Sequence, residues 1–270
     1  MGSGTTFKEV SGSTMKNIVV RVPVSIEEQR RIARILGAID DKIEENEKIN
    51  NNLQQQAVTI FEKWLQTKHV TSEDSLANLT TEIIRGQTTK YVEKSELINI
   101  NQKVNKGQHL DMQYCKYLDP TIPISLEKFT QKGDILLNSL GQGTLGRTHF
   151  WYNDEKNFIV DQHITIIRAR ENITTPEYLY MVLSSAEFYN KFLGSVTGST
   201  GMQMLNISVV RSMTIPVYSY EDQLELSSVL TPIFDMIESH CFENQKLAIL
   251  RDSLLPKLMS GELCVENIVV

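Results

Sequence analysis

A glycine-rich stretch in the middle of the chain contains the residues whose types and spacing most clearly suggest a chemical function. Gly141-Gln142-Gly143-Thr144-Leu145-Gly146 fits the G-x-G-x-x-G pattern of dinucleotide-binding loops, and with Arg147-Thr148 it nearly fits a phosphate-binding P-loop. Such loops bind phosphate at the N-terminus of the helix that they open. Here a β-rich run, residues 147–152, follows instead, and arginine replaces the P-loop lysine. The stretch therefore predicts a hairpin that exposes backbone amides, Thr144 and Arg147 to a polyanion; a nucleotide site is the alternative.

A second group of residues could act in acid–base chemistry. His163 lies two residues from Asp161, between two expected strands. A lone pair of this kind more often has a structural role, and no Ser-His-Asp arrangement can be argued from sequence order alone. The sequence also has no Asn/Asp-Pro-Pro-aromatic loop of the DNA methyltransferases, and no acidic-lysine nuclease set stands out. We therefore expect no catalytic residues, no metal and no cofactor.

A duplicated long helix is the element that must position these residues. One copy is predicted from Ser25 to Gln66 and the other from Ser219 to Gly261, and they align without gaps at an offset of 194 residues. Each copy follows a proline turn and opens with an acidic pair and a glutamine. At about 1.5 Å per residue, a helix of about 40 residues is about 60 Å long and needs a partner along its seam.

The seam of each copy follows steps of four and three residues, as in a coiled coil. Its two central positions are polar in both copies, which favours a device that fixes the register of the helices; exposure to solvent or to a partner protein is the alternative. The predicted seam residues are Ile39, Ile43, Asn46, Asn50, Leu53, Ile60, Trp64, Ile233, Ile237, His240, Asn244, Leu247, Leu254 and Leu258.

The middle of the chain, residues 76–218, predicts a mixed domain of the α+β class with a strongly curled sheet. A helix should start at Pro176, with Thr175 as its N-cap, and another should run from Ala186 to Leu193. Polar Gly/Ser/Thr loops recur in both repeat units, at residues 3–7 and 197–201. The expected strands cover residues 79–86, 135–140, 157–160 and 164–168.

Charge and composition restrict the possible ligands. The net charge of −6 is concentrated in residues 219–270, which carry nine acidic and three basic residues. This is not the basic footprint of a stand-alone DNA-binding protein, so a partner should supply part of any phosphate contact. The sequence has no apolar run of about 18 residues and no signal peptide, which predicts a cytoplasmic protein without a membrane span. Its three scattered cysteines are expected to be reduced thiols: Cys115, Cys241 and Cys264.

The order of these elements resembles the specificity subunits of type I restriction-modification systems over nearly the whole chain. No single motif is decisive, but the ordered set and the repeat are fairly specific. The elements that carry the resemblance are Ile83-Ile84-Arg85-Gly86-Gln87-Thr88, Gly133-Asp134-Ile135-Leu136 with its glycine hairpin, Asp161-Gln162-His163, Gly198-Ser199-Thr200, and Ile215-Pro216 with Glu221-Asp222-Gln223 opening the second helix.

The resemblance implies a non-catalytic subunit that recognises double-stranded DNA for an adenine-specific methyltransferase/endonuclease complex. Two spacer helices, residues 24–75 and 219–270, would form an antiparallel coiled coil that docks methyltransferase (modification) subunits and, through them, a restriction subunit. Residues 76–218 would be a target-recognition domain and residues 1–23 the tail of another, so the chain looks truncated or half-size. A homodimer could restore a split palindromic site; a monomer whose helices fold onto each other is the alternative.

Loop chemistry and the resemblance together select candidate DNA contacts. Gln87, Gln142 and Gln203 could bridge adenine and Arg147 could bind guanine, unless they contact phosphate or nothing. The competing classes are a coiled-coil scaffold with a protein-binding middle domain and an enzyme that binds nucleotide at Gly141–Gly146. The full candidate set is Arg85, Gln87, Thr88, Lys90, Ser139, Gln142, Thr144, Arg147, Ser199, Thr200 and Gln203.

Overall fold

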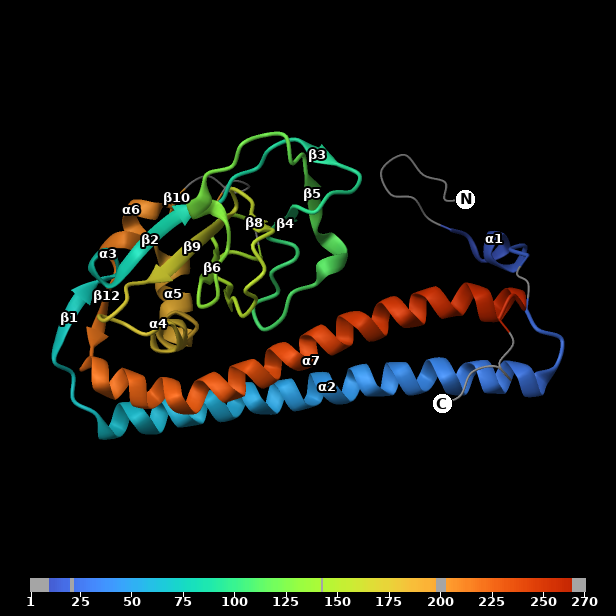
Figure 1. The fold of residues 1–270 in the computed structure, drawn as a ribbon, viewed down its shortest axis with the longest axis horizontal. Helices are drawn as coiled ribbons and strands as arrows, with labels where there is room; N and C mark the ends of the chain where they lie inside the picture. The colour runs from blue at the N-terminus through green and yellow to red at the C-terminus, as the bar shows by residue number, and fades with distance from the viewer. Residues whose placement is uncertain (1–9, 20–21, 142, 198–202, 264–270) are drawn as a thin grey trace. The chain divides into compact units, whose positions relative to one another are not determined.

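Two long helices, α2 (Ile26–Thr67) and α7 (Tyr220–Ser260), carry the fold (Figure 1). The computed structural model describes residues 10–19, 22–141, 143–197 and 203–263. By its internal contacts the chain divides into two compact units, residues 1–49 with 240–270, and residues 50–239. Both helices pass through both units, so the segment boundaries expected from the sequence stay a prediction.

The first unit holds the N-terminal part of α2, the C-terminal part of α7 and the short helix α1 (Gly12–Lys16). Ile32 packs in one cluster with Leu258. Farther along α2, Asp40 pairs with Arg251 at 2.8 Å, and the Asn46 amide donates to Asn244 at 2.8 Å. Residue numbers rise on one helix as they fall on the other. The helices are therefore antiparallel here, as expected.

The second unit contains the other parts of both helices, again antiparallel. The Asn50 amide donates to the carbonyl of Ile237 at 3.3 Å, and the Trp64 indole donates to the carbonyl of Asp222 at 3.2 Å. In the first unit Asn244 makes the repeat-related bond, at 3.3 Å to the carbonyl of Ile43.

Every predicted seam residue is buried or half-buried, with Asn46 fully buried and Asn50 8% exposed. The polar seam positions thus bond across the helix pair, which supports the interpretation that they fix its register.

The mixed domain in the second unit contains two four-stranded sheets, which confirms the α+β class. One sheet is antiparallel throughout, and the other includes one parallel pair, β4 with β8. In spatial order the first sheet consists of β2 (Thr80–Arg85), β9 (Ile164–Ala169), β6 (Ile135–Asn138) and β7 (Thr148–Phe150). The second consists of β3 (Tyr91–Val92), β5 (Lys116–Leu118), β4 (Ile98–Ile100) and β8 (Phe158–Val160).

Smaller elements complete the second unit. Two are strand pairs: β1 (Ser72–Ser75) with β12 (Thr214–Val217), and β10 (Val196–Thr197) with β11 (Met204–Leu205). The others are α3 (Leu76–Leu79), α4 (Pro176–Leu183), α5 (Ala186–Gly194), α6 (Ile207–Ser212), and the 3-10 turns η1 (Met112–Tyr114) and η2 (Leu126–Lys128). The predicted cap of α4 is confirmed, because the Thr175 hydroxyl accepts from the amide of Tyr178.

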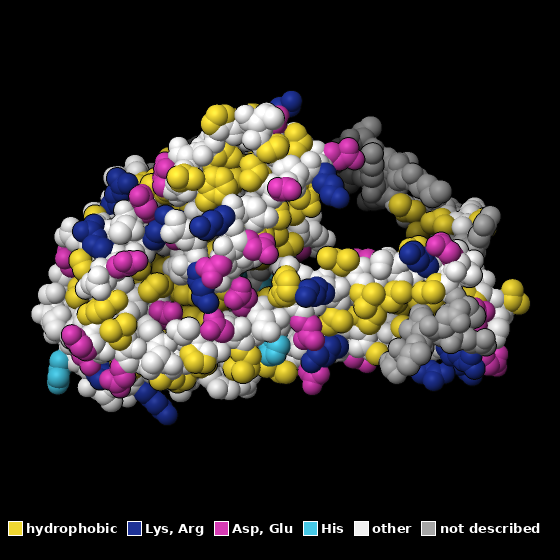
Figure 2. All heavy atoms as spheres, viewed as in Figure 1, with side chains coloured by type: hydrophobic (Ala, Val, Ile, Leu, Met, Phe, Trp, Pro, Cys, Tyr) yellow, Lys and Arg dark blue, Asp and Glu magenta, His cyan; other side chains and the backbone are white. Residues whose placement is uncertain are grey.

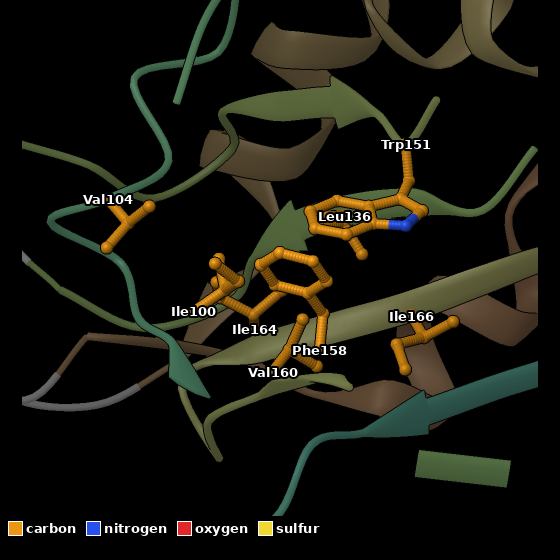
Figure 3. Close-up of a cluster of buried hydrophobic side chains, with 8 residues drawn as sticks. All are labelled: Ile100, Val104, Leu136, Trp151, Phe158, Val160, Ile164 and Ile166. Atoms are coloured by element: carbon orange, nitrogen blue, oxygen red, sulfur yellow. The ribbon is translucent and has the colours of Figure 1, made fainter. Parts of the chain in front are cut away.

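The core of the domain contains buried side chains from both sheets (Figure 3). The residues of β6 and β8 are all buried and almost all apolar because side chains on both faces of these strands are covered. The rings of Trp151 and Phe158 lie 5.0 Å apart, edge to face. The cluster consists of Ile100, Val104, Leu136, Trp151, Phe158, Val160, Ile164 and Ile166.

Gln223 anchors the domain to the beginning of α7. Its side chain is fully buried, and its Oε1 accepts from the Thr175 amide and the Thr174 hydroxyl, both at 3.0 Å. Its Nε2 donates to the carbonyl of Tyr218 at 3.0 Å. The glutamine that opens the helix thus binds the residues that open α4. In the first copy of the repeat, the equivalent Gln29 donates to the carbonyl of Pro23 at 2.7 Å.

Replacing Gln223 by alanine should therefore destabilise the second unit by about 2–3 kcal/mol, because buried donors and acceptors lose their partner. Urea unfolding followed by tryptophan fluorescence reports on this unit, since both tryptophans of the chain, Trp64 and Trp151, lie in it. Gln29→Ala is the matched control and should shift this transition by less than about 1 kcal/mol. Equal effects of the two substitutions would contradict the proposed anchor.

Candidate nucleic-acid interface

The antiparallel sheet brings the candidate loops to one end of the domain. Strands β2 and β6 finish at the end where β9 and β7 begin. Residues 86–90 follow β2, residues 139–147 connect β6 to β7, and residues 161–163 precede β9. We call these three segments, together with β10 and β11, the loop end. Three segments that are distant in sequence thus form one surface.

Arg85 holds the loop end together. Its guanidinium donates to the carbonyl of Leu205 at 2.7 Å and to that of Gln162 at 3.2 Å. Burial lowers the pKa of Arg85, but a guanidinium stays charged in proteins. The amide of Leu205 donates to the carbonyl of Ser139 at 2.9 Å, which links β11 to the hairpin as well. Arg85 thus joins β2 to two other segments of the loop end, and its predicted contact with DNA stays a prediction.

Ser139, also predicted to contact DNA, does not present its side chain at the surface of the loop end. Its side chain is fully buried, and its hydroxyl lies 2.6 Å from that of Thr165 on the neighbouring strand. The hydroxyl also donates to the carbonyl of Leu137 at 3.3 Å, so its hydrogen bonds are made inside the domain. Its backbone, by contrast, joins two other segments of the loop end.

The other described candidates lie at the loop end with different degrees of exposure. Lys90 and Gln203 are exposed, and Lys90 is only loosely paired with Asp119, at 3.9 Å. Gln87 and Thr88 are half-buried. The half-buried residues of the hairpin are Thr144 and Arg147, whose guanidinium donates to the carbonyl of Gly143 at 3.0 Å. Gln142, Ser199 and Thr200 lie outside the described residues.

The glycine stretch is a hairpin, as the sequence predicted. It leads into β7 and opens no helix, so it lacks the element on which a nucleotide loop binds phosphate. Gly146 has a φ of 84°, and a Cβ at this position would lie 3.1 Å from the ring of Tyr189. A glycine is therefore required where the hairpin returns to the sheet.

Residues 101–110 form hydrogen bonds with the two strands that flank this hairpin, and no pattern in the sequence predicted this role. The side-chain amide of Asn138 donates to the carbonyls of Gln102 and Asn105, at 3.3 and 3.4 Å. Asn105 in turn donates to the carbonyl of Leu136 at 3.0 Å, and His149 bonds the carbonyl of Gly107 at 2.8 Å. These contacts join segments about 30 to 40 residues apart, and no local pattern predicts them.

Comparison with known proteins identifies the family. A family model described as the type I restriction modification DNA specificity domain matches residues 2–55 and 87–248, well over half of the chain. The chain belongs to this family. The resemblance seen in the sequence is thereby confirmed.

Relatives in this family extend beyond the length of this chain. The specificity subunit of the type I restriction enzyme MjaIX from Methanocaldococcus jannaschii is 26% identical over 99% of this chain, which spans 66% of that protein. The HindI specificity subunit from Haemophilus influenzae is 30% identical over 56% of this chain and 32% of its own length. A crystal structure of a type I restriction-modification S subunit from M. genitalium aligns with a TM-score of 0.57 at 18% identity. The alignment covers 96% of this chain and 67% of that one, and shows the same fold.

Two further searches gave negative results for the described part of the chain. No cluster of histidine, cysteine and acidic residues there could hold a metal ion. None of the helices in the same residues is long and apolar enough to cross a membrane.

The buried histidine beneath the hairpin makes stability depend on pH. Burial lowers the pKa of His149 to about 4, although its bond to the Gly107 carbonyl opposes the shift. Below its ordinary pKa of about 6.5 the unfolded chain takes up a proton that the folded chain excludes. Stability from this group is thus complete above about pH 6.5 and falls as the pH approaches 4, by about 3 kcal/mol in total.

His149→Asn keeps an amide donor for Gly107 but cannot titrate, so its free energy of unfolding should fall less between pH 7 and pH 4.5. Urea titrations at a series of pH values measure the difference. Exposed His69, which is not among the groups that shift the pKa of His149, offers the control, since His69→Asn should leave the pH dependence contributed by His149 unchanged. Parallel profiles for wild type and His149→Asn would refute the prediction.

Proposed function

We propose that this chain is the DNA-recognition subunit of a type I restriction-modification complex and carries out no reaction itself. It would direct adenine-specific methyltransferase subunits, and through them a restriction subunit, to a split DNA site. Family membership supports this proposal, as do the names of the relatives as specificity subunits. The observation that carries it is the convergence of polar loops at one end of the domain, locked by Arg85.

Within this proposal the described loop residues divide by chemistry. Exposed Lys90 suits a phosphate, since the ion pair described for it, with Asp119, is long at 3.9 Å. Gln87 and Gln203 carry amides that can bridge the edge of an adenine, and Arg147 can bind guanine or phosphate. Thr88 and Thr144 offer hydroxyl groups to either. Arg85, Gln142, Ser199 and Thr200 stay candidates on sequence grounds, and the buried side chain of Ser139 suits a DNA contact least.

The charge distribution suits a subunit that shares DNA with a partner. On the face drawn in Figure 2, basic and acidic side chains alternate over the second unit instead of forming one basic patch. Counterion release from a few phosphates gives limited affinity at physiological salt. Methyltransferase subunits would supply the remaining contacts, and the acidic, partly apolar outer faces of α2 and α7 are the proposed docking surface. Exposed apolar residues on α7 include Leu224, Val229, Met236, Phe242 and Ile249.

The helix seam favours pairing of α2 with α7 over pairing between two identical helices. In the first unit, Asp40 of α2 pairs with Arg251 of α7. The repeat-related positions are apolar and buried, Ala57 and Phe234. An antiparallel pair of two α2 helices would set Asp40 opposite Ala57 and leave a carboxylate without its partner. We propose that each chain pairs its own helices, and that any homodimer with a palindromic site uses another surface.

One experiment tests the whole proposal. The chain is co-expressed with type I methyltransferase subunits, the complex is isolated by a tag on the chain, and genomic adenine methylation is mapped. We expect a stable complex and methylation at one sequence motif that disappears without the chain. Copurification without any DNA binding or motif would favour the scaffold alternative and overturn the proposal. ATP binding by the isolated chain would favour the nucleotide alternative.

Arg147→Ala should weaken binding of the complex to a duplex carrying that motif by about 1–3 kcal/mol, because a charged contact to a base or phosphate is lost. Titrations at one fixed salt concentration measure the change. Arg170, just beyond β9 at the end opposite the loop end, supplies the control: Arg170→Ala should leave DNA affinity within about twofold. Unchanged affinity for Arg147→Ala would remove Arg147 from the interface.

A further inference from the structure

Asp161 and His163 form a fixed pair at the loop end. Asp161 is 3% exposed, and its two carboxylate oxygens contact the amide and the ring Nδ1 of His163, each at 2.8 Å. A carboxylate can only accept, so Nδ1 carries a proton and points inward. The ring is about one-third exposed, and Nε2 is its remaining polar atom.

The turn that carries this pair is anchored on three sides. The carbonyl of His163 accepts the amides of Ser139 and Leu140, at 2.8 and 3.2 Å, and that of Gln162 accepts from Arg85. The amide of Asp161 donates to the carbonyl of Ile100 at 2.9 Å. The imidazole therefore sits on backbone that cannot move without breaking bonds to β2, to the hairpin and to β4. Preorganisation of this kind is typical of residues that contact a ligand.

Among the described residues, the carboxylate of Asp161 is paired with His163. Both hydrogen bonds described for its carboxylate come from His163. The other ionisable groups of the surrounding elements are engaged elsewhere: Arg85 of β2 bonds carbonyls, Lys128 of η2 donates to the carbonyl of Arg85, and Tyr91 of β3 is neutral. An imidazolium that donates to this carboxylate through Nδ1 would present a second N–H at Nε2.

We propose that His163, held by Asp161, binds a backbone phosphate of the DNA through Nε2 as an imidazolium. Asp161 is then a positioning residue. The inference rests on the proposed function and deepens it, because it assigns a role to the Asp-Gln-His turn that is neither catalytic nor merely structural. A neutral ring that accepts from a base edge would use the same atom, but would release no counterion.

Salt dependence separates these roles without knowledge of the target sequence. The complex of the full chain with methyltransferase subunits is titrated with a duplex of arbitrary sequence over a range of salt concentrations, at about pH 6. Each phosphate contact by a cation contributes about 0.9 to the slope of log K against log salt. His163→Gln should lower the slope by about that amount. His69→Gln, an exposed histidine between α2 and β1, should leave the slope unchanged.

The pH provides the second readout. Histidine side chains ordinarily change charge between about pH 6 and pH 8. The wild-type slope should fall as the pH is raised over this range and meet that of His163→Gln, whose slope should stay constant. Asp161→Asn keeps an acceptor for the backbone amide of His163 but removes the negative charge. At pH 6 the slope of this variant should be lower than that of wild type, as for His163→Gln.

Each outcome decides the question. Equal slopes for wild type and His163→Gln at every pH from about 6 to 8 would overturn the inference while leaving the proposed function intact. An equal loss of affinity at every salt concentration, with the slope preserved, would indicate a structural or base-reading role and would also overturn it. If the wild-type complex binds no duplex at all, the proposed function fails first and the inference fails with it.

Discussion

The antiparallel order β2-β9-β6-β7 is the constraint on which the rest of the domain depends. It sends the ends of β2 and β6 and the beginnings of β7 and β9 to one edge, so that segments up to about 80 residues apart become neighbours. The guanidinium of Arg85 donates hydrogen bonds to the carbonyls of Gln162 and Leu205, in two other segments of the loop end. Hydrogen bonds from a charged donor are worth about 1.5–3 kcal/mol each, which is enough to hold short loops that have little core of their own.

The repeated helix solves two different problems with one sequence pattern. Next to the mixed domain, Gln223 of the second copy binds the residues that open α4, and the buried rings of Trp64 from the first copy and Tyr218 lie 4.6 Å apart. At the middle of the seam, Asn50 and Asn244 make the same bond to repeat-related carbonyls, 3.3 Å in both cases. Buried amides require matched partners, so this pattern fixes a register that leucines alone would leave free to slip.

The sequence predicted the helices and strands in which buried apolar residues recur at a regular spacing. Apolar runs and heptad steps indicated β6, β8, β9, α4 and both long helices, because burial repeats at fixed spacing along them. Strands of two or three residues, such as β3, have no room for such a pattern. Long-range polar contacts were also missed: fully buried Asp134 receives two bonds from Arg168, at 2.7 and 2.8 Å, from the neighbouring strand β9. The burial of Ser139 could not be predicted either, since the composition of a loop does not reveal which way a side chain points.

The loop end separates support from recognition. Its segments are held by backbone groups: the His163 carbonyl accepts two amides of the hairpin, the Leu205 amide donates to Ser139, and the Gln87 amide donates to Val160. Any residue other than proline supplies these donors and acceptors. Exposed side chains on the same segments, such as Lys90 and Gln203, can therefore change without loss of the framework. If these side chains read DNA, the target can change by substitution while the fold, which Arg85 and the sheet order fix, stays the same.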